Sequence, residues 1–306
     1  MPRLPPERVR AIEHAEEVED DETLDKLLAE ERRERAELEM APGWEEDVES
    51  RLSDVLAREG RRRKDASDRK TVDEVFDRQT LLTLYKLISS GLFETLDYPV
   101  STGKEANVFH ASTKEGGSLA VKIFRTNTAT FRSFMTYISG DPRFASVRPN
   151  RRDIVHAWCQ KEYKNLQRMR EHAIRVPNPV AYLHNVLVME FIGTAGTPAP
   201  RLRDKAPSDP KAAYGTLLAI MRKTWTEAGL VHGDFSEFNV LNLDDEMVVI
   251  DVAQAVLKRH PMARELLERD VRNFSRHFRK YGIQTDEAAL VLALAPPRAP
   301  EDRAKR

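Results

Sequence analysis

Residues 230–251, LVHGDFSEFNVLNLDDEMVVID, carry the most specific chemical pattern in the sequence. His232 and Asp234 form an HGD turn, Asn239 comes five residues after that Asp, and Asp251 ends an apolar strand. Transfer of a phosphoryl group from a nucleotide needs these parts: one Asp orients the nucleophile and accepts its proton, while an Asn and a second Asp hold Mg²⁺ on the phosphates. An HGD turn alone would be an ordinary loop. With these residues in register, the pattern favours catalysis.

Lys122 and Glu162 complete this set from other parts of the chain. Lys122 lies in the apolar strand AVKIF, where its neighbours Val121 and Ile123 point to the opposite face because side chains alternate along a strand. The helix expected over residues 152–171 carries Glu162 on a stripe that is otherwise apolar: Val155, Cys159, Leu166 and Met169. A buried carboxylate is costly unless it is paired. We therefore predict an ion pair between Glu162 and Lys122; the alternative places Glu162 at the wet margin of the stripe.

The stretch STGKEANVF is the candidate phosphate loop. Laid on the kinase glycine loop G-x-G-x-x-G-x-V, it aligns Ser101, Gly103, Ala106 and Val108 with the motif and keeps one glycine of three. Taken alone, it fits a phosphate cradle and a polar turn equally well. With the catalytic residues behind it, we interpret it as a nucleotide-binding loop, in which Gly103 allows close backbone approach, Lys104 adds a cation and Val108 covers the adenine.

The strand NVLVMEFI is predicted as the hinge between two lobes. Backbone groups of Glu190 and Ile192 are then positioned for the adenine edge. Met189 is either a wall of the adenine pocket or a core residue, since a Met at the end of a buried strand is more often core. Together with the phosphate loop and Lys122, these residues form the predicted ATP site.

The predicted fold class is α+β, a bilobal protein-kinase-like fold. Residues 71–192 form an N-lobe of antiparallel sheet and helices, and residues 193–294 form a reduced, mainly helical C-lobe. Only 55 residues follow Asp251 and none resembles an activation loop, so we predict that this loop is absent. Residues 125–152 are a long, weakly periodic insertion that we expect to be mobile, and residues 295–306 are a tail.

Residues 1–70 are a charged extension, poor in large apolar side chains, that is either helical or disordered. Its basic cluster RRRK at 61–64 is a solvated linker or, alternatively, an arm that contacts RNA. A capping box at Thr71 predicts the start of a helix that ends at Gly91. Pro261 is predicted as the first residue of a helix in the C-lobe.

Composition excludes several classes of protein. The net charge of −1 and pI of about 6.7 give no overall basic signature of nucleic-acid binding. The single cysteine, Cys159, excludes an internal disulfide framework and a cysteine zinc site. No apolar run approaches ~20 residues, and the N-terminus lacks a signal-peptide core, so we expect a cytoplasmic protein without a membrane partner.

Four motifs resemble the RIO atypical serine/threonine kinases, specifically the archaeal-like type-1 branch: DRQTLLTLYKLISSGLFETLDYPV, STGKEANVF, HGDFSEFNVL and IDVAQ. The resemblance covers roughly residues 72–282. It implies that Asp234 is the catalytic Asp, that Asn239 and Asp251 hold Mg²⁺, and that Asp251 can itself accept phosphate. Ala253 stands where Ser is more usual in the last motif.

The resemblance also implies cofactors, partners and a role. The cofactors are ATP and Mg²⁺, and ATP hydrolysis accompanies phosphorylation of serine or threonine in a protein substrate or in the chain itself. Ser133 and Ser139, in the insertion, are candidates for autophosphorylation. The partner is a precursor of the small ribosomal subunit, made of protein and rRNA, during late maturation in the cytoplasm, and we expect a monomer.

Two alternative functions use the same residues. Small-molecule phosphotransferases of the aminoglycoside or choline kinase type also have HGD, a downstream Asn and a strand-terminal Asp. Their large helical substrate domain does not fit the about 37 residues between Gly193 and Leu230. The other alternative is a non-catalytic ATP-binding scaffold on pre-ribosomes. Competent residue types at all five catalytic positions argue against it.

Overall fold

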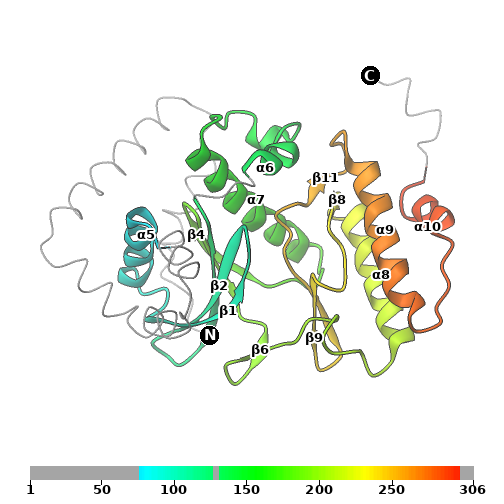
Figure 1. The fold of residues 1–306 in the computed structure, drawn as a ribbon, viewed down its shortest axis with the longest axis horizontal. Coiled ribbons are helices and arrows are strands. Elements are labelled where there is room, and N and C mark those ends of the chain that lie inside the picture. The colour runs from blue at the N-terminus through cyan, green and yellow to red at the C-terminus, as the bar shows by residue number, and fades with distance from the viewer. Residues whose placement is uncertain (1–75, 127–130, 297–306) are drawn as a thin grey trace, which may run out of the picture. The chain divides into compact units, whose positions relative to one another are not determined.

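The structure is a computed structural model that describes residues 76–126 and 131–296 (Figure 1). The predictions for residues 1–70, for the basic cluster at 61–64, for the capping box at Thr71 and for most of the tail fall outside the described residues. In the part that is described, no helix is both long and apolar enough to cross a membrane.

An antiparallel five-stranded sheet forms the centre of the N-lobe, in the order β1-β2-β3-β5-β4. Its strands are β1 (Thr95–Thr102), β2 (Ala106–Ser112), β3 (Ser118–Phe124), β4 (Pro179–Leu183) and β5 (Val186–Glu190). Gly116 has a φ of +77° in the tight turn that joins β2 to the antiparallel strand β3, a left-handed conformation that favours glycine. This register places Lys122 opposite Val108 on β2 and Leu187 on β5.

Three helices accompany this sheet: α5 (Arg78–Ser89), α6 (Phe131–Ile138) and α7 (Arg151–Glu171). The described helix α5 begins at Arg78 because Asp77 caps it, accepting a hydrogen bond from Thr80 N at 2.7 Å. Its last helical residue is Ser89, and the predicted stop, Gly91, follows the C-cap Ser90 with a left-handed φ of +77°. Helix α7 agrees with the expected span and places Cys159 in the core, also as expected.

The insertion contains more regular structure than its sequence indicates. Besides α6, it includes the short 3-10 helix η2 (Pro142–Phe144). Phe134 of α6 stacks on Trp158 of α7 with ring centroids 4.4 Å apart, and Phe144 is buried nearby. These aromatic contacts with a distant helix explain why the local pattern reads as a loop. The mobility expected for the insertion stays a prediction.

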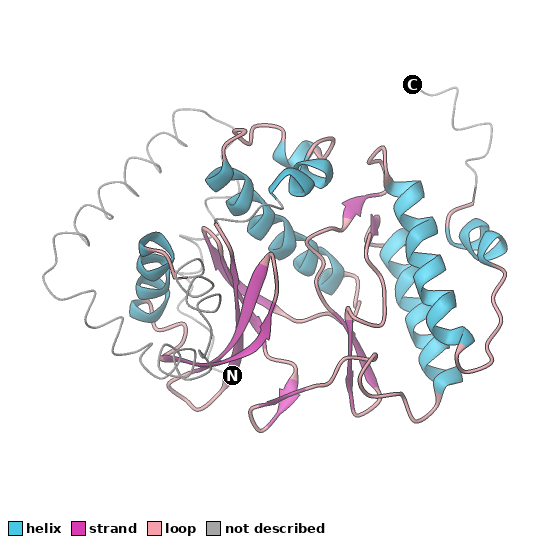
Figure 2. Cartoon of the chain, in the orientation of Figure 1, coloured by secondary structure: helices cyan, strands magenta, loops and turns pink. Residues whose placement is uncertain are grey.

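The C-lobe is mainly helical, as predicted, with short strand pairs between the helices (Figure 2). Its helices are α8 (Pro210–Thr226), α9 (Ala263–Arg279) and α10 (Glu287–Leu294). Its strands are β6 (Gly193–Thr194), β7 (Thr197–Pro198), β8 (Leu230–Val231), β9 (Val240–Leu243), β10 (Glu246–Val249) and β11 (Val256–Leu257). Only residues 252–262 separate Asp251 from α9, so an activation loop is absent here. The N-cap of α9 is Met262, so the placement of Pro261 as its first helical residue is wrong.

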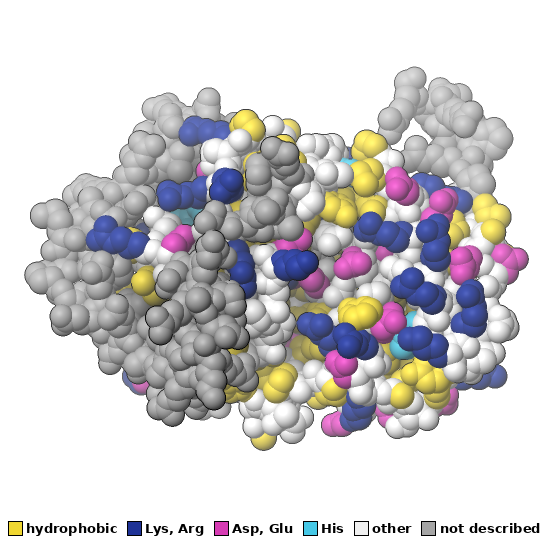
Figure 3. All heavy atoms as spheres, viewed as in Figure 1, with side chains coloured by type: hydrophobic (Ala, Val, Ile, Leu, Met, Phe, Trp, Pro, Cys, Tyr) yellow, Lys and Arg dark blue, Asp and Glu magenta, His cyan; other side chains and the backbone are white. Residues whose placement is uncertain are grey.

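Charged side chains of both signs are spread over the face of the C-lobe that Figure 3 shows. In the space-filling view, Lys and Arg side chains alternate with Asp and Glu rather than forming one basic patch (Figure 3). On α9, for example, Arg264 pairs with Glu268 one turn later at 3.1 Å. This mixed surface agrees with the near-zero net charge of the chain.

Candidate active site

Lys122 and Glu162 form the predicted ion pair at the centre of the site. The Lys122 ammonium donates to Glu162 Oε2 at 2.5 Å and to Oε1 at 2.7 Å. Both residues are buried, with 7% and 1% of their surfaces exposed. Strand β3 supplies the lysine and the inward face of α7 supplies the glutamate, which confirms the interpretation of that stripe and excludes a wet margin for Glu162.

Asp251 joins this pair from the other lobe. Lys122 Nζ donates to Asp251 Oδ1 at 3.0 Å, although the two residues are 129 positions apart. Asp251 has a φ of +61°, a left-handed conformation that is uncommon for residues other than glycine and occurs often at functional sites. Its side chain is 52% exposed, so the carboxylate is accessible to a ligand while one oxygen contacts the lysine.

Charge coupling fixes the protonation states in this cluster. Burial alone would lower the pKa of Lys122, but the carboxylates of Asp251 and Glu162 outweigh it and raise that pKa. The ammonium group in turn lowers the pKa of Asp251. Burial raises the pKa of Glu162 to about 7, and Lys122 opposes this rise. At neutral pH the cluster therefore contains a cation beside an ionised Asp251.

The HGD loop places Asp234 next to Asn239. Asn239 Nδ2 donates to Asp234 Oδ2 at 2.8 Å and to the Asp234 carbonyl at 2.9 Å. His232 orients the turn through both of its ring nitrogens. The Asp234 N–H donates to His232 Nδ1 at 3.2 Å. The ring proton is therefore on Nε2, which donates to the Ile250 carbonyl at 3.1 Å. Burial raises the pKa of Asp234, while the hydrogen bond from Asn239 acts against this rise. Asp234 is thus the candidate proton acceptor, held in one orientation.

Asp270 supports this loop and was not identified from the sequence. The N–H groups of Gly233 and Phe235, on either side of Asp234, both donate to its carboxylate at 2.8 Å. Asp270 is 1% exposed, and burial raises its pKa to about 6. The sequence did contain a signal for this residue, because Asp270 lies on the apolar stripe of α9 with buried residues such as Val271. The argument used for Glu162 therefore applies to it equally.

Arg269 binds the same loop from the neighbouring position on α9. Its guanidinium donates to the Gly233 carbonyl and, at 3.3 Å, to the hydroxyl of Tyr137 on α6. The insertion is thereby connected to the catalytic loop. Sequence reasoning missed Arg269 too, because an arginine on an exposed helix face is ordinarily a solvated residue.

The candidate phosphate loop is the tip of the β1–β2 hairpin. Gly103 N–H donates to the Ala106 carbonyl at 3.0 Å, and a Cβ at Gly103 would lie 3.0 Å from that oxygen. This close approach explains the retained glycine. Lys104 and Gly103 are exposed, and Arg201 from the C-lobe contacts Ser101 Oγ at 3.4 Å. The roles of these residues in nucleotide binding stay predictions.

The predicted hinge follows β5 directly. Met189 is 9% exposed, which fits both interpretations given above. The carboxylate of Glu190 pairs with Arg175 at 2.8 Å and its N–H donates to the Asn178 carbonyl at 2.8 Å, so neither group is free to contact an adenine. Ile192 accepts a hydrogen bond from Ala199 N–H at 2.9 Å. Because its carbonyl is occupied, Ile192 would serve the adenine through its N–H.

The residues at the site fit Mg²⁺ bound together with phosphates. Among the described residues, no group of three or more His, Cys, Asp or Glu side chains could hold a metal alone. Mg²⁺ is ordinarily held by one or two protein oxygens plus water and substrate phosphates. The accessible carboxylate of Asp251 meets that need, and so does Asn239, whose amide nitrogen is committed to Asp234 and whose Oδ1 is the remaining ligand atom.

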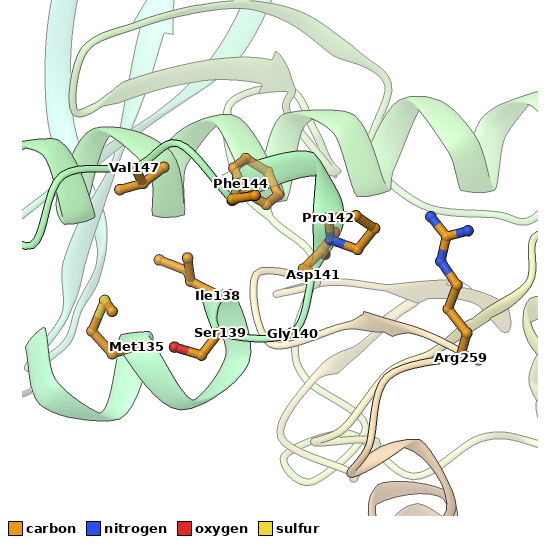
Figure 4. A pocket seen from close by; sticks show the side chains of 10 residues that line it. Met135, Ile138, Ser139, Gly140, Asp141, Pro142, Phe144, Val147 and Arg259 are labelled. Carbon is orange, nitrogen blue, oxygen red and sulfur yellow. The ribbon is translucent and has the colours of Figure 1, made fainter.

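A cavity of about 540 Å³ lies beside the insertion, lined by α6, η2 and Arg259 (Figure 4). It contains none of the predicted catalytic or nucleotide-binding residues, and its chemistry does not resemble a nucleotide site. Ser139, one of the two candidate autophosphorylation sites, lines it. Ser133 lies on α6 and is exposed. The choice between the two serines stays a prediction.

Comparisons with known proteins agree with this geometry. The family model of the RIO domain matches residues 107–290. A RIO-type serine/threonine-protein kinase Rio1 from Haloferax volcanii is 43% identical over 256 residues, which cover 81% of this chain and 88% of the relative. A protein of the same name from Methanocaldococcus jannaschii is 43% identical over 218 residues, covering 71% and 74%.

A solved structure shares the fold. The Rio2 kinase–ADP/Mg²⁺-phosphoaspartate complex from Chaetomium thermophilum aligns with a TM-score of 0.53 and 20% identity, covering 72% of this chain and 67% of that one. The predicted kinase-like α+β fold is thereby confirmed. Because the RIO domain matches residues 107–290 and two archaeal Rio1 kinases are 43% identical, the chain belongs to the RIO family of atypical protein kinases, in the branch of the Rio1 proteins.

Proposed function

We propose that this chain transfers the γ-phosphoryl group of ATP to serine or threonine hydroxyls, with Mg²⁺, and also hydrolyses ATP. One observation carries the proposal: Lys122, paired with Glu162, reaches Asp251 across the two lobes at 3.0 Å. In protein kinases the lysine–glutamate pair and the metal-binding Asp must both be in place for phosphoryl transfer. The names of the Rio1 relatives, serine/threonine-protein kinases, support the same class of acceptor and speak against a small-molecule phosphotransferase.

Each residue has a distinct task in this reaction. Lys122 neutralises negative charge on the phosphates, and Glu162 holds its ammonium in position. Asp234 orients the attacking hydroxyl and accepts its proton, with Asn239 fixing the carboxylate. Asn239 and Asp251 would hold Mg²⁺, which would supply further charge neutralisation on the phosphate oxygens.

Asp251 is also a candidate phosphate acceptor. In this second reaction, a carboxylate oxygen of Asp251 forms a bond to the γ-phosphorus of ATP. The bond between the γ-phosphorus and the β-phosphate oxygen breaks, and ADP leaves. Water then cleaves the acyl phosphate to inorganic phosphate and regenerates the carboxylate, so the sum is ATP hydrolysis. The half-exposed side chain permits this approach. The related solved Rio2 structure is a phosphoaspartate complex, which supports the proposal by analogy.

Labelled ATP tests the activity. With γ-labelled ATP, Mg²⁺, a mixed protein substrate and a panel of small alcohols and aminoglycosides, label is expected on protein and in free phosphate. Label on Asp251 is expected to be released by hydroxylamine, whereas label on serine or threonine resists it. Efficient transfer to a small molecule would instead establish the rival phosphotransferase function.

For the biological role, we propose maturation of the small ribosomal subunit, on a precursor particle in the cytoplasm. The resemblance to the RIO family supports this role. Capture with the Asp251→Ala protein as bait is expected to enrich precursor small-subunit particles, because a block in the ATP cycle prolongs the complex. Equal recovery of ribosomal RNA with this bait and with an unrelated control protein would contradict the role but leave the kinase activity untouched.

A further inference from the structure

Helix α7 holds the turn that follows Asp251, residues 252–255. Lys161 donates to the Ala253 carbonyl at 2.8 Å and to the Ala255 carbonyl. Asn165, one turn along the helix, donates from Nδ2 to the carbonyls of Val252 and Ala255, both at 2.9 Å. Four hydrogen bonds from two side chains thus bind this short turn to the helix.

A lysine at this depth requires a reason. Lys161 is completely buried, and an ammonium group out of water is expensive unless it is well satisfied. Its hydrogen-bond partners are carbonyls of the turn rather than a carboxylate, and the Trp158 ring lies 5.3 Å away. Burial, with the nearby Arg143, lowers its pKa to about 7. The chain therefore bears a desolvation cost in order to fix this backbone.

Arg143 of the insertion sets the orientation of Asn165. Its Nη1 donates to Asn165 Oδ1 at 3.0 Å, so the amide nitrogen faces the turn. The buried carboxylate of Asp141 holds Arg143 in place, with Nη2–Oδ2 at 2.7 Å and Nε–Oδ1 at 3.0 Å. Asp141 also borders the cavity beside η2 (Figure 4). The network therefore runs from the insertion through α7 to the turn.

The same helix face carries Glu162, the partner of Lys122. Asp251 itself is half exposed, and its hydrogen bond to Lys122 is a single contact of 3.0 Å. Its left-handed backbone persists only where the surrounding structure stabilises it, and the 252–255 turn is part of that structure. We propose that Lys161, Asn165 and Arg143 are positioning residues for Asp251: they hold the 252–255 turn so that its carboxylate faces both Lys122 and the Mg²⁺–nucleotide complex. This inference rests on the proposed function.

The test measures Mg²⁺ dependence without turnover. The full chain is titrated with Mg²⁺ in the presence of a non-hydrolysable ATP analogue, and the rise in Tm gives the half-saturating Mg²⁺ concentration. In Lys161→Met and Asn165→Leu this concentration is expected to rise by about 10-fold or more, as for other residues that orient metal ligands. Affinity for the analogue without Mg²⁺ is expected to stay within about 2-fold. Lys164→Met, half-buried on the same helix and outside the network, is the matched control.

Three comparisons decide the outcome. A wild-type Mg²⁺ requirement in Lys161→Met and Asn165→Leu, together with a lost response in Asp251→Asn, overturns the positioning role alone. An equal rise in Lys164→Met also overturns it, because the effect is then a general one of the helix. A wild-type response in Asp251→Asn shows that the metal assignment in the proposed function is wrong, and the inference falls with it. Should both buried variants fail to fold, the milder Arg143→Lys, which cannot preserve the fork to Asp141 and Asn165, decides by the same readout.

Discussion

Replacing Asp234 with alanine is expected to abolish phosphoryl transfer while leaving ATP binding nearly intact. A positioned proton acceptor contributes about 10²–10⁴-fold to a rate, and this loss is expected in kcat rather than in affinity. The reason is the geometry of the contacts: Asp234 is bonded to Asn239 and His232, whereas the phosphate-side lysine is bonded to Glu162 and Asp251. The two halves of the site can therefore be separated by mutation.

Two quantities are measured for each folded variant and for the wild type: the rate of phosphate release from ATP and the affinity for the nucleotide. Asp234→Asn serves as the matched variant, because it preserves volume and polarity but cannot accept the proton. Both variants are expected to be inactive and to bind nucleotide within about 3-fold of the wild type, a difference of less than 1 kcal/mol. Lost nucleotide binding in a protein of normal Tm would show that Asp234 holds the nucleotide and is not the proton acceptor.

The parts of this site that sequence reasoning identified share a local signature. Glu162 interrupts an apolar helical stripe, Lys122 interrupts an apolar strand, and the HGD loop carries its spacing within one short stretch. In each case the anomaly and the periodic background lie in the same element, so one sequence is sufficient. The hairpin STGKEANVF has no such anomaly against a periodic background. A tight turn and a phosphate cradle would both require a glycine at position 103, so the sequence left the two interpretations open.

The parts that were missed depend on partners remote in the sequence. Lys161 and Asn165 are bonded to backbone carbonyls about 90 positions away, and backbone partners leave no trace in residue types. Helix α6 was missed because Phe134 finds its stacking partner on α7 rather than within its own turn. Tertiary contacts, rather than local propensity, decided each of these.

Asp270→Ala is expected to cost both stability and activity. The variant leaves the N–H groups of Gly233 and Phe235 buried without an acceptor, and each unsatisfied buried donor costs about 1–3 kcal/mol. We expect a loss of about 2–6 kcal/mol in the free energy of unfolding and a fall in Tm of roughly 5–20 °C. Since those two groups flank Asp234, kcat is expected to fall about 100-fold as its carboxylate is displaced.

Asp270→Asn separates the two effects. The amide fills the same volume, but only one of its two ends can accept, so one backbone N–H loses its partner while the loop stays packed. Tm is expected to fall less than in Asp270→Ala, and kcat to remain low when measured well below Tm. The control is Glu268→Ala on the exposed face of α9, where loss of the pair with Arg264 is expected to change stability by less than about 0.5 kcal/mol. A wild-type kcat in Asp270→Asn with a lowered Tm would make Asp270 a packing residue only, because the carboxylate would then stabilise the fold without setting the position of Asp234.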